Sequence, residues 1–205
     1  MTTEADHIVR ETASRILADF ADPQTINAAR DSRWKEPLWR ALTDAGLPLA
    51  WVPEEQGAAA ASIAEGFAIL GAIGRYAVPV PLAETLLAGW LLARGGIKAP
   101  AGAMTIAPVR PRDAIVFNAD GTLSGSVGGV PFASESDHVA ILASGVAGPM
   151  IALANTADCR IGEGKNLAGE PANAVHFDHA KPVASARADS RATRRSSNLM
   201  TMSFT

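Results

Sequence analysis

The sequence predicts an α+β protein with an all-helical amino-terminal domain followed by an antiparallel β domain of barrel or sandwich-like form. Apolar residues recur at helical spacing through the first hundred residues, and after Pro100 they alternate with a period of two. From Ala184 onward the residues form no apolar face. We therefore expect a helical domain over 1–99, a β domain over 100–183, and an irregular or disordered basic tail over 184–205.

Three of the expected helices follow from apolar spacing and from residues that start or stop a helix. The first covers about 8–20, and the second has Pro37 in its first turn. Gly46 is expected to end the second helix in a left-handed conformation. The last helix of the domain covers about 82–94 and is closed by two glycines.

The remaining helix begins at a capping box, in which Ser62 is followed three residues later by Glu65. Gly66, Gly71 and Gly74 lie inside this helix. Each glycine costs about 1 kcal/mol relative to alanine in a helix interior. We therefore expect these glycines to allow a neighbouring element to approach the backbone closely.

The β domain is expected to contain short strands of the length that sheets commonly use. Asp120-Gly121 predicts a hairpin turn between the second and third strands. A run of small residues from Ser124 to Gly129 lacks the strand-to-helix context of a dinucleotide site and indicates a bulged or tightly packed strand. The expected strands are 104–107, 114–117, 123–126, 138–143, 150–154 and 174–177.

Charge and composition exclude several classes of protein. The first 180 residues carry 13 Lys and Arg against 20 Asp and Glu, which gives no footprint for nucleic acid. The longest apolar stretch, about 86–93, is too short to cross a membrane. The single cysteine, Cys159, excludes an internal disulfide framework, and we expect a cytoplasmic protein. His176 and His179 have the H-x-x-H spacing of some metal sites, but no cluster of Cys or carboxylate residues joins them, so no metal site is expected.

Several segments of the helical half together resemble one enzyme family. They run from Leu38 to Leu47, from Val52 to Gly57, and from Leu70 to Thr85 in the expected order. They are similar to the amino-terminal domain of the flavin-dependent acyl-CoA dehydrogenases. The β half is similar to the middle domain of that family, especially at Gly125–Ala133 and Val175–Ala180.

This resemblance implies an oxidoreductase that uses FAD and removes two hydrogens from the α and β carbons of an acyl-CoA thioester. In the family the catalytic base lies on a carboxy-terminal helical domain, and no part of this sequence matches that domain. We therefore assign no catalytic residue. Whether the chain is an enzyme by itself stays open.

The family's flavin-binding positions can be assigned to residues of this sequence by alignment only, because the residue types differ. Where the family has a threonine that bonds the flavin, this chain has Ile106. Where the family has Trp-Ile-Thr or Trp-Ile-Ser beside the ring, it has Gly129, Val130 and Pro131. Only backbone groups could serve at these positions, and Pro131 has no N–H to donate.

Two interpretations fit these features. The chain is either a truncated acyl-CoA dehydrogenase that is inactive alone, or a non-catalytic partner subunit of a heteromeric enzyme. Both predict apolar helix faces left exposed, which favours association with another copy or with a different acyl-CoA dehydrogenase chain.

Overall fold

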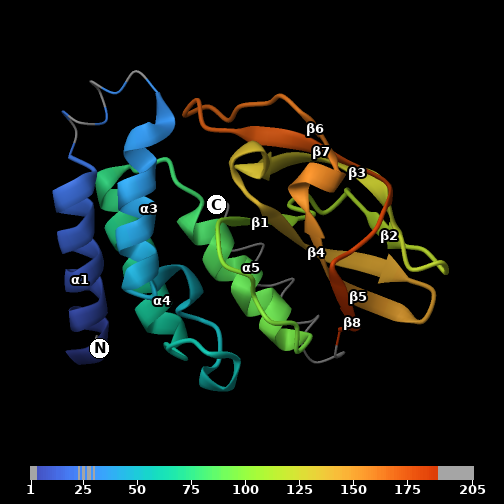
Figure 1. Cartoon of the computed structure of the whole chain (residues 1–205), viewed down its shortest axis with the longest axis horizontal. Helices are drawn as coiled ribbons and strands as arrows, with labels where there is room; N and C mark the ends of the chain where they lie inside the picture. Colours follow the sequence, from blue (N-terminus) through green and yellow to red (C-terminus); the bar gives the residue numbers. More distant parts are fainter. Residues whose placement is uncertain (1–3, 23, 25, 27–28, 30, 189–205) are drawn as a thin grey trace. The chain divides into compact units, whose positions relative to one another are not determined.

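The computed structural model describes residues 4–22, 24, 26, 29 and 31–188 (Figure 1). The chain divides into two compact units, one up to Leu86 and the other from Leu87. The division therefore falls within helix α5 (Leu82–Arg94). In the described part of the chain, no helix has the length and apolar character needed to cross a membrane.

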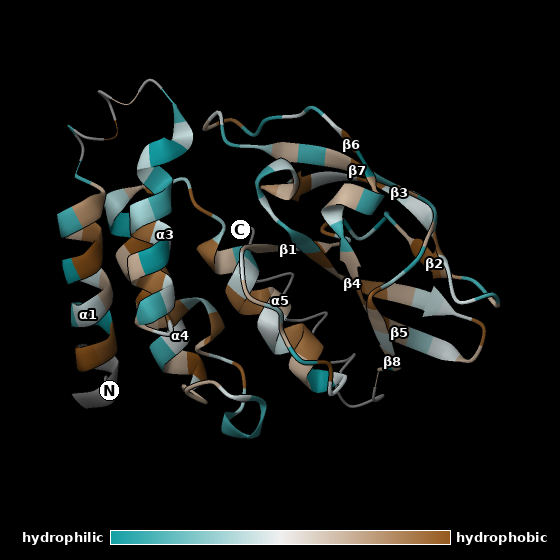
Figure 2. Ribbon diagram, viewed as in Figure 1, coloured by the Kyte–Doolittle hydropathy of each residue, from teal (hydrophilic) through white to brown (hydrophobic). Residues whose placement is uncertain are grey.

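The first unit is built around the helix α1 (Glu4–Phe20), which lies against both α3 (Lys35–Asp44) and α4 (Ile63–Tyr76). Figure 2 shows both apolar and polar residues along each of these helices, as expected for amphipathic helices. Each of these three helices buries one apolar stripe. The buried side chains include Ala13, Leu17, Leu38, Leu42, Ile69 and Ala72.

The expected helix ends are confirmed. Gly46 adopts φ +70°, the left-handed conformation that follows α3. The capping box at α4 is complete, since Ser62 Oγ accepts from the Glu65 amide at 3.1 Å and Glu65 Oε2 accepts from the Ser62 amide at 2.6 Å. These bonds satisfy amide groups that have no partner within the helix.

Gly66 allows the close approach that the sequence predicts. The indole of Trp51 fills the space that a Cβ at this position would need, and its Nε1 donates to the Ser62 carbonyl at 3.2 Å. The same ring meets Phe67 edge-on, with centroids 5.7 Å apart. For Gly71 and Gly74 the prediction is wrong, because no atom of the described structure lies within 4 Å of the position of an added Cβ.

The second unit contains a mostly antiparallel sheet with the strand order β6-β7-β3-β2-β4-β5-β8, and β1 is attached to β4. The β1–β4 and β2–β4 pairs are parallel, and the other pairs are antiparallel. Among the described strands the sheet is not closed into a barrel, because β6 and β8 form its two ends. The strands are β1 (Met104–Ala107), β2 (Ile115–Phe117), β3 (Leu123–Pro131), β4 (His138–Gly145), β5 (Gly148–Asn155), β6 (Arg160–Gly162), β7 (Ala172–Ala180) and β8 (Ala184–Arg187).

Alternate residues of these strands form the core of the second unit. Ile115, Val127, Ile141, Val175 and Phe177 are all buried in one cluster. The end of α5 approaches the sheet closely, since a Cβ at Gly95 would lie 3.3 Å from the Ala186 Cβ and 3.4 Å from Ile151. The helix therefore ends where only a small residue fits between it and β5–β8.

Strand β3 is longer than predicted, and its register shifts twice, between Leu123 and Gly125 and between Val127 and Val130. These irregularities confirm the expected bulged strand. They also explain the difference in length, because a bulge breaks the period of two on which the prediction depends.

The segment Ala184–Arg187, which the sequence pattern places in the irregular tail, forms β8 and pairs antiparallel with Met150–Leu153 of β5. Its small and polar side chains form no apolar face, so only the backbone hydrogen bonds of the ladder reveal the strand. Strand β6 is also absent from the predicted set, because its three residues include a single apolar side chain, Ile161. The expected disorder over 189–205 lies outside the described residues.

The contact between Trp51 and Gly66 should control the stability of the first unit. We expect Gly66→Ala to lower the free energy of unfolding by about 1–3 kcal/mol, because the added methyl group overlaps the indole. The matched change Gly71→Ala in the same helix should raise it by about 0.5–1 kcal/mol, since it meets no neighbour. Urea denaturation followed by tryptophan fluorescence measures both, and equal effects of the two variants would contradict the assignment.

Candidate functional site

The carried-over positions lie together at one place in the second unit, where β1 meets the end of β3. Ile106 lies on β1, and Gly129, Val130 and Pro131 form the last three residues of β3. Thr105 joins the two strands, because its Oγ1 donates to the Pro131 carbonyl at 2.5 Å. Its side chain is fully buried.

Two of the side chains at these positions pack in the protein interior. Ile106 is 4% exposed, and Val130 is fully buried within the core cluster of the sheet. The Pro131 carbonyl is already engaged by Thr105, and proline has no N–H. These three positions therefore present no polar side chain to a bound ring.

The loop between β1 and β2 covers the remaining position, Gly129. Asp113 holds this loop to β3, because its Oδ2 accepts from the Gly128 amide at 2.9 Å. The Asp113 amide in turn donates to the Arg110 carbonyl at 3.0 Å, which closes a turn. The Arg110 guanidinium then lies over the two glycines, so that a Cβ at Gly128 would be 3.0 Å from Nη1 and a Cβ at Gly129 2.8 Å from Nη2.

Sequence reasoning did not select Arg110. Its only sequence signal is its position between two prolines, Pro108 and Pro111. The contact forms because the turn at Asp113 brings the loop back onto a strand that lies almost twenty residues further along the chain.

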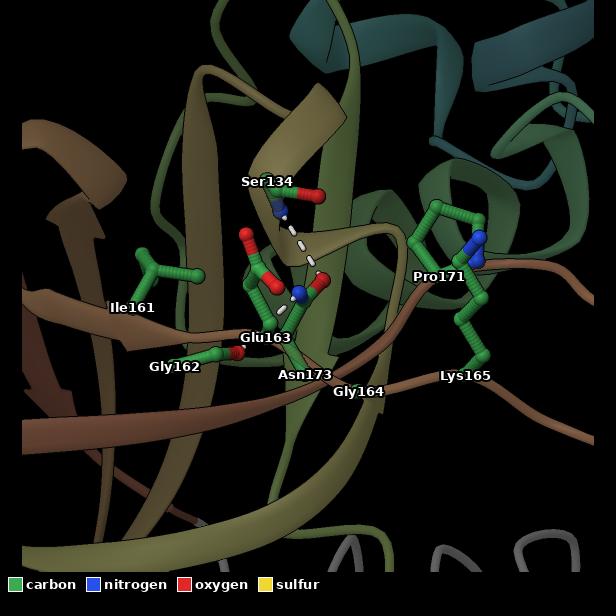
Figure 3. A pocket seen from close by; sticks show the side chains of 8 residues that line it. All are labelled: Ser134, Ile161, Gly162, Glu163, Gly164, Lys165, Pro171 and Asn173. Atoms are coloured by element: carbon green, nitrogen blue, oxygen red, sulfur yellow. Dashed lines mark hydrogen bonds between the residues drawn. The ribbon is translucent and has the colours of Figure 1, made fainter.

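A separate pocket of about 650 Å³ lies beside β6 and β7 (Figure 3). Asn173 is buried at its base, where Oδ1 accepts from the Ser134 amide at 3.1 Å and Nδ2 donates to the Gly162 carbonyl at 3.2 Å. Figure 3 shows both bonds joining the walls of the pocket. Because Glu163 and Lys165, its charged groups, are exposed and opposite in sign, the pocket does not favour one charge of ligand.

Comparison with known proteins bears on these observations. Residues 3–99 match the family model for the acyl-CoA dehydrogenase, N-terminal domain. Acyl-CoA dehydrogenase IpdE2 of Mycobacterium tuberculosis is 31% identical over 140 residues, and IpdE2 of Mycolicibacterium smegmatis is 28% identical over 138 residues. Residues 3–99 therefore belong to the acyl-CoA dehydrogenase N-terminal domain family, and the two relatives support the same family for the chain. These alignments cover 66% of the chain and 44% of each relative, so the chain matches less than half the length of the relatives.

Several solved structures share the fold. The ChsE4-ChsE5 complex from Mycobacterium tuberculosis matches with a TM-score of 0.81 at 20% identity, covering 97% of this chain and 61% of that chain. A variant of the Tcur3481-Tcur3483 steroid ACAD matches with a TM-score of 0.77 at 24% identity, covering 96% of this chain and 60% of that chain. The Bacillus anthracis acyl-CoA dehydrogenase complexed with FAD matches with a TM-score of 0.67 at 15% identity, covering 97% of this chain and 40% of that chain. The expected fold, helices followed by a mostly antiparallel sheet, is thus confirmed.

The two histidines of the H-x-x-H pattern have different partners in this acyl-CoA dehydrogenase fold. His176 Nδ1 lies 2.8 Å from Ser126 Oγ, and His179 Nδ1 lies 3.2 Å from Thr122 Oγ1. Thr122 also donates to Asp120, and this side-chain hydrogen bond is the main cause that lowers the pKa of Asp120. Within the described residues, no group of three His, Cys, Asp or Glu is placed to hold a metal ion.

Cys159 is a poor candidate for a nucleophile. Burial raises the pKa of its thiol to about 11, and the negative charge of Asp158 adds to this effect. The thiol lies 3.5 Å from the Asn155 carbonyl, to which it can donate. Because the thiolate is the reactive form, this environment suppresses the reactivity of the residue.

The hydrogen bond between Thr105 and Pro131 should hold β1 against β3. We expect Thr105→Val to destabilise the second unit by about 1–3 kcal/mol, because the Pro131 carbonyl loses its donor. Thr105→Ser keeps the hydroxyl and should cost less. Hydrogen exchange of the β1 and β3 amides reports the difference, and wild-type protection in the valine variant would contradict this role.

Alkylation of Cys159 should be slow in the folded chain. At pH 8 we expect iodoacetamide to react about 100-fold more slowly than in the urea-unfolded chain, because the thiol pKa rises from 9.0 to about 11. The stability that the neutral thiol contributes is fully present below pH 9.0 and decreases as the pH rises toward 11. Equal rates in the folded and unfolded chains would show that the thiol is not shielded.

Proposed function

We propose that this chain is a partner subunit of a heteromeric acyl-CoA dehydrogenase. In this proposal the complex removes two hydrogens across the α and β carbons of an acyl-CoA thioester with FAD as cofactor. A second acyl-CoA dehydrogenase chain supplies the catalytic base and the flavin-binding surface. The observation that carries the proposal is the β1–β3 surface, formed by Ile106 and by Gly128 to Pro131. Its Pro131 carbonyl and its Gly128 amide already bond within the chain.

The nature of the similar structures supports the assignment of a partner. Two of them are two-chain assemblies, the ChsE4-ChsE5 complex and the Tcur3481-Tcur3483 steroid ACAD, and both match this chain over almost its whole length. The second of these assemblies is a steroid enzyme. A steroid-derived acyl-CoA is therefore the first substrate class to test for the complex.

The surface of the first unit also supports association. Ile63 and Phe67 are exposed by 46% and 48%, and they lie one turn apart on α4, so they share a face of the helix. On α1, Ile8 is 59% exposed. Large apolar side chains gathered on a helix face commonly mark a protein–protein contact.

Co-expression with the other acyl-CoA dehydrogenase chains of the same genome tests the proposal. We expect one of them to co-purify at a fixed ratio with this chain and to carry the flavin. The purified complex should oxidise an acyl-CoA in the presence of an artificial electron acceptor, and this chain alone should not. Steroid-derived and straight-chain thioesters together separate the substrate classes.

Two results would contradict the proposal. The first is oxidation of an acyl-CoA by the isolated chain with FAD bound. The second is the absence of a complex with every acyl-CoA dehydrogenase chain that is tested.

A further inference from the structure

We infer that Arg110 closes the β1–β3 surface of this chain, so that a flavin ring cannot lie where the alignment with the family places it. The inference deepens the proposed function and rests on it in one respect, because it assigns the flavin to the partner chain. It concerns residues of the second unit only and can be tested on the isolated chain.

The closure depends first on the absence of a side chain at position 129. Gly129 has φ +73°, a conformation that glycine adopts without strain. A Cβ there would lie 2.8 Å from Arg110 Nη2 and 3.2 Å from its Nε. The family has a tryptophan at the aligned position, so the guanidinium occupies the space where that side chain would begin.

The position of Arg110 is fixed from two sides. Asp113 bonds to the Gly128 amide at 2.9 Å and to the Arg110 carbonyl through its own amide at 3.0 Å, which ties the loop to β3. Pro108 and Pro111 restrict the backbone on either side of the arginine. The guanidinium lies close to two successive glycines, since a Cβ would be 3.0 Å from Nη1 at Gly128 and 2.8 Å from Nη2 at Gly129.

The chemistry of the closed surface also differs from what a flavin needs. The ring carries polar atoms at its edge, and a buried polar atom without a partner costs about 1–3 kcal/mol. Ile106 offers an aliphatic side chain there, and the Pro131 carbonyl and the Gly128 amide are both engaged within the chain. These residues do not fit the cofactor, in contrast to the hydroxyl groups that the family provides.

The experiment is a fluorescence titration of FAD with the full chain and three variants. Arg110→Ala removes the guanidinium, and Arg112→Ala is the matched control from the same loop, with the same change of charge. Gly128→Ala retains Arg110, and because its Cβ would lie 3.0 Å from Nη1 the guanidinium needs to shift only slightly. Circular dichroism checks that each variant folds.

We expect the wild-type chain and Arg112→Ala to show weak, unsaturated binding. Arg110→Ala should bind FAD about tenfold more tightly, because the surface opens. Gly128→Ala keeps the guanidinium and should bind FAD as weakly as the wild-type chain. Stoichiometric FAD binding by the wild-type chain would overturn the inference. Unchanged or weaker binding in Arg110→Ala would overturn it as well, since the arginine would then play no part in closure or would itself contact the cofactor.

The two proposals fail in different ways. If no partner chain forms a complex but Arg110→Ala gains FAD affinity, the partner assignment fails and the closure stands. If a flavin-containing complex forms and Arg110→Ala shows no gain in the isolated chain, the closure fails and the partner assignment stands.

Discussion

Strand β3 is the element on which the second unit depends. It pairs with β2 on one side and β7 on the other, and its last residue accepts the hydrogen bond from Thr105 on β1. This arrangement requires a very close approach at Gly125, where a Cβ would lie 2.7 Å from the Ala114 carbonyl oxygen. No larger residue fits there, so the glycine permits the hairpin to close on the strand. The register shift that follows, between Val127 and Val130, lies just before the end of β3 that contacts β1 and the Arg110 loop.

Much of the fold could be predicted from local patterns, because the responsible interactions are close in the sequence. The capping box at Ser62 and the left-handed Gly46 are defined by residues within one turn of each helix end. Strand β1 was predicted with its observed bounds, since all four of its residues are apolar or packed in the core. At these three places the structure favoured by the local sequence is also the one that tertiary packing stabilises, so the sequence pattern predicts it correctly.

The parts that could not be predicted depend on contacts between distant residues. Strand β8 is held by backbone pairing with β5, and its alternation of alanine with serine and arginine carries no apolar signal. The position of Arg110 depends on Asp113 bonding to Gly128, a contact that no spacing rule describes. The family alignment identified the β1–β3 region as a candidate site, but it could not show that an arginine from the intervening loop lies over it. Similarity of fold therefore does not carry the chemistry of the site with it.

Strand β8 has a consequence for the behaviour of the chain in concentrated solution. The far side of β5 would otherwise present a row of unpaired amide and carbonyl groups along Met150–Leu153, and such an edge is a template for pairing with another molecule. Among the described strands, β8 covers this edge with four residues and places the exposed, charged Arg187 at the new border of the sheet. Short length and a basic side chain both discourage further strand addition. Four residues with no apolar face thereby protect the sheet from growing into an aggregate.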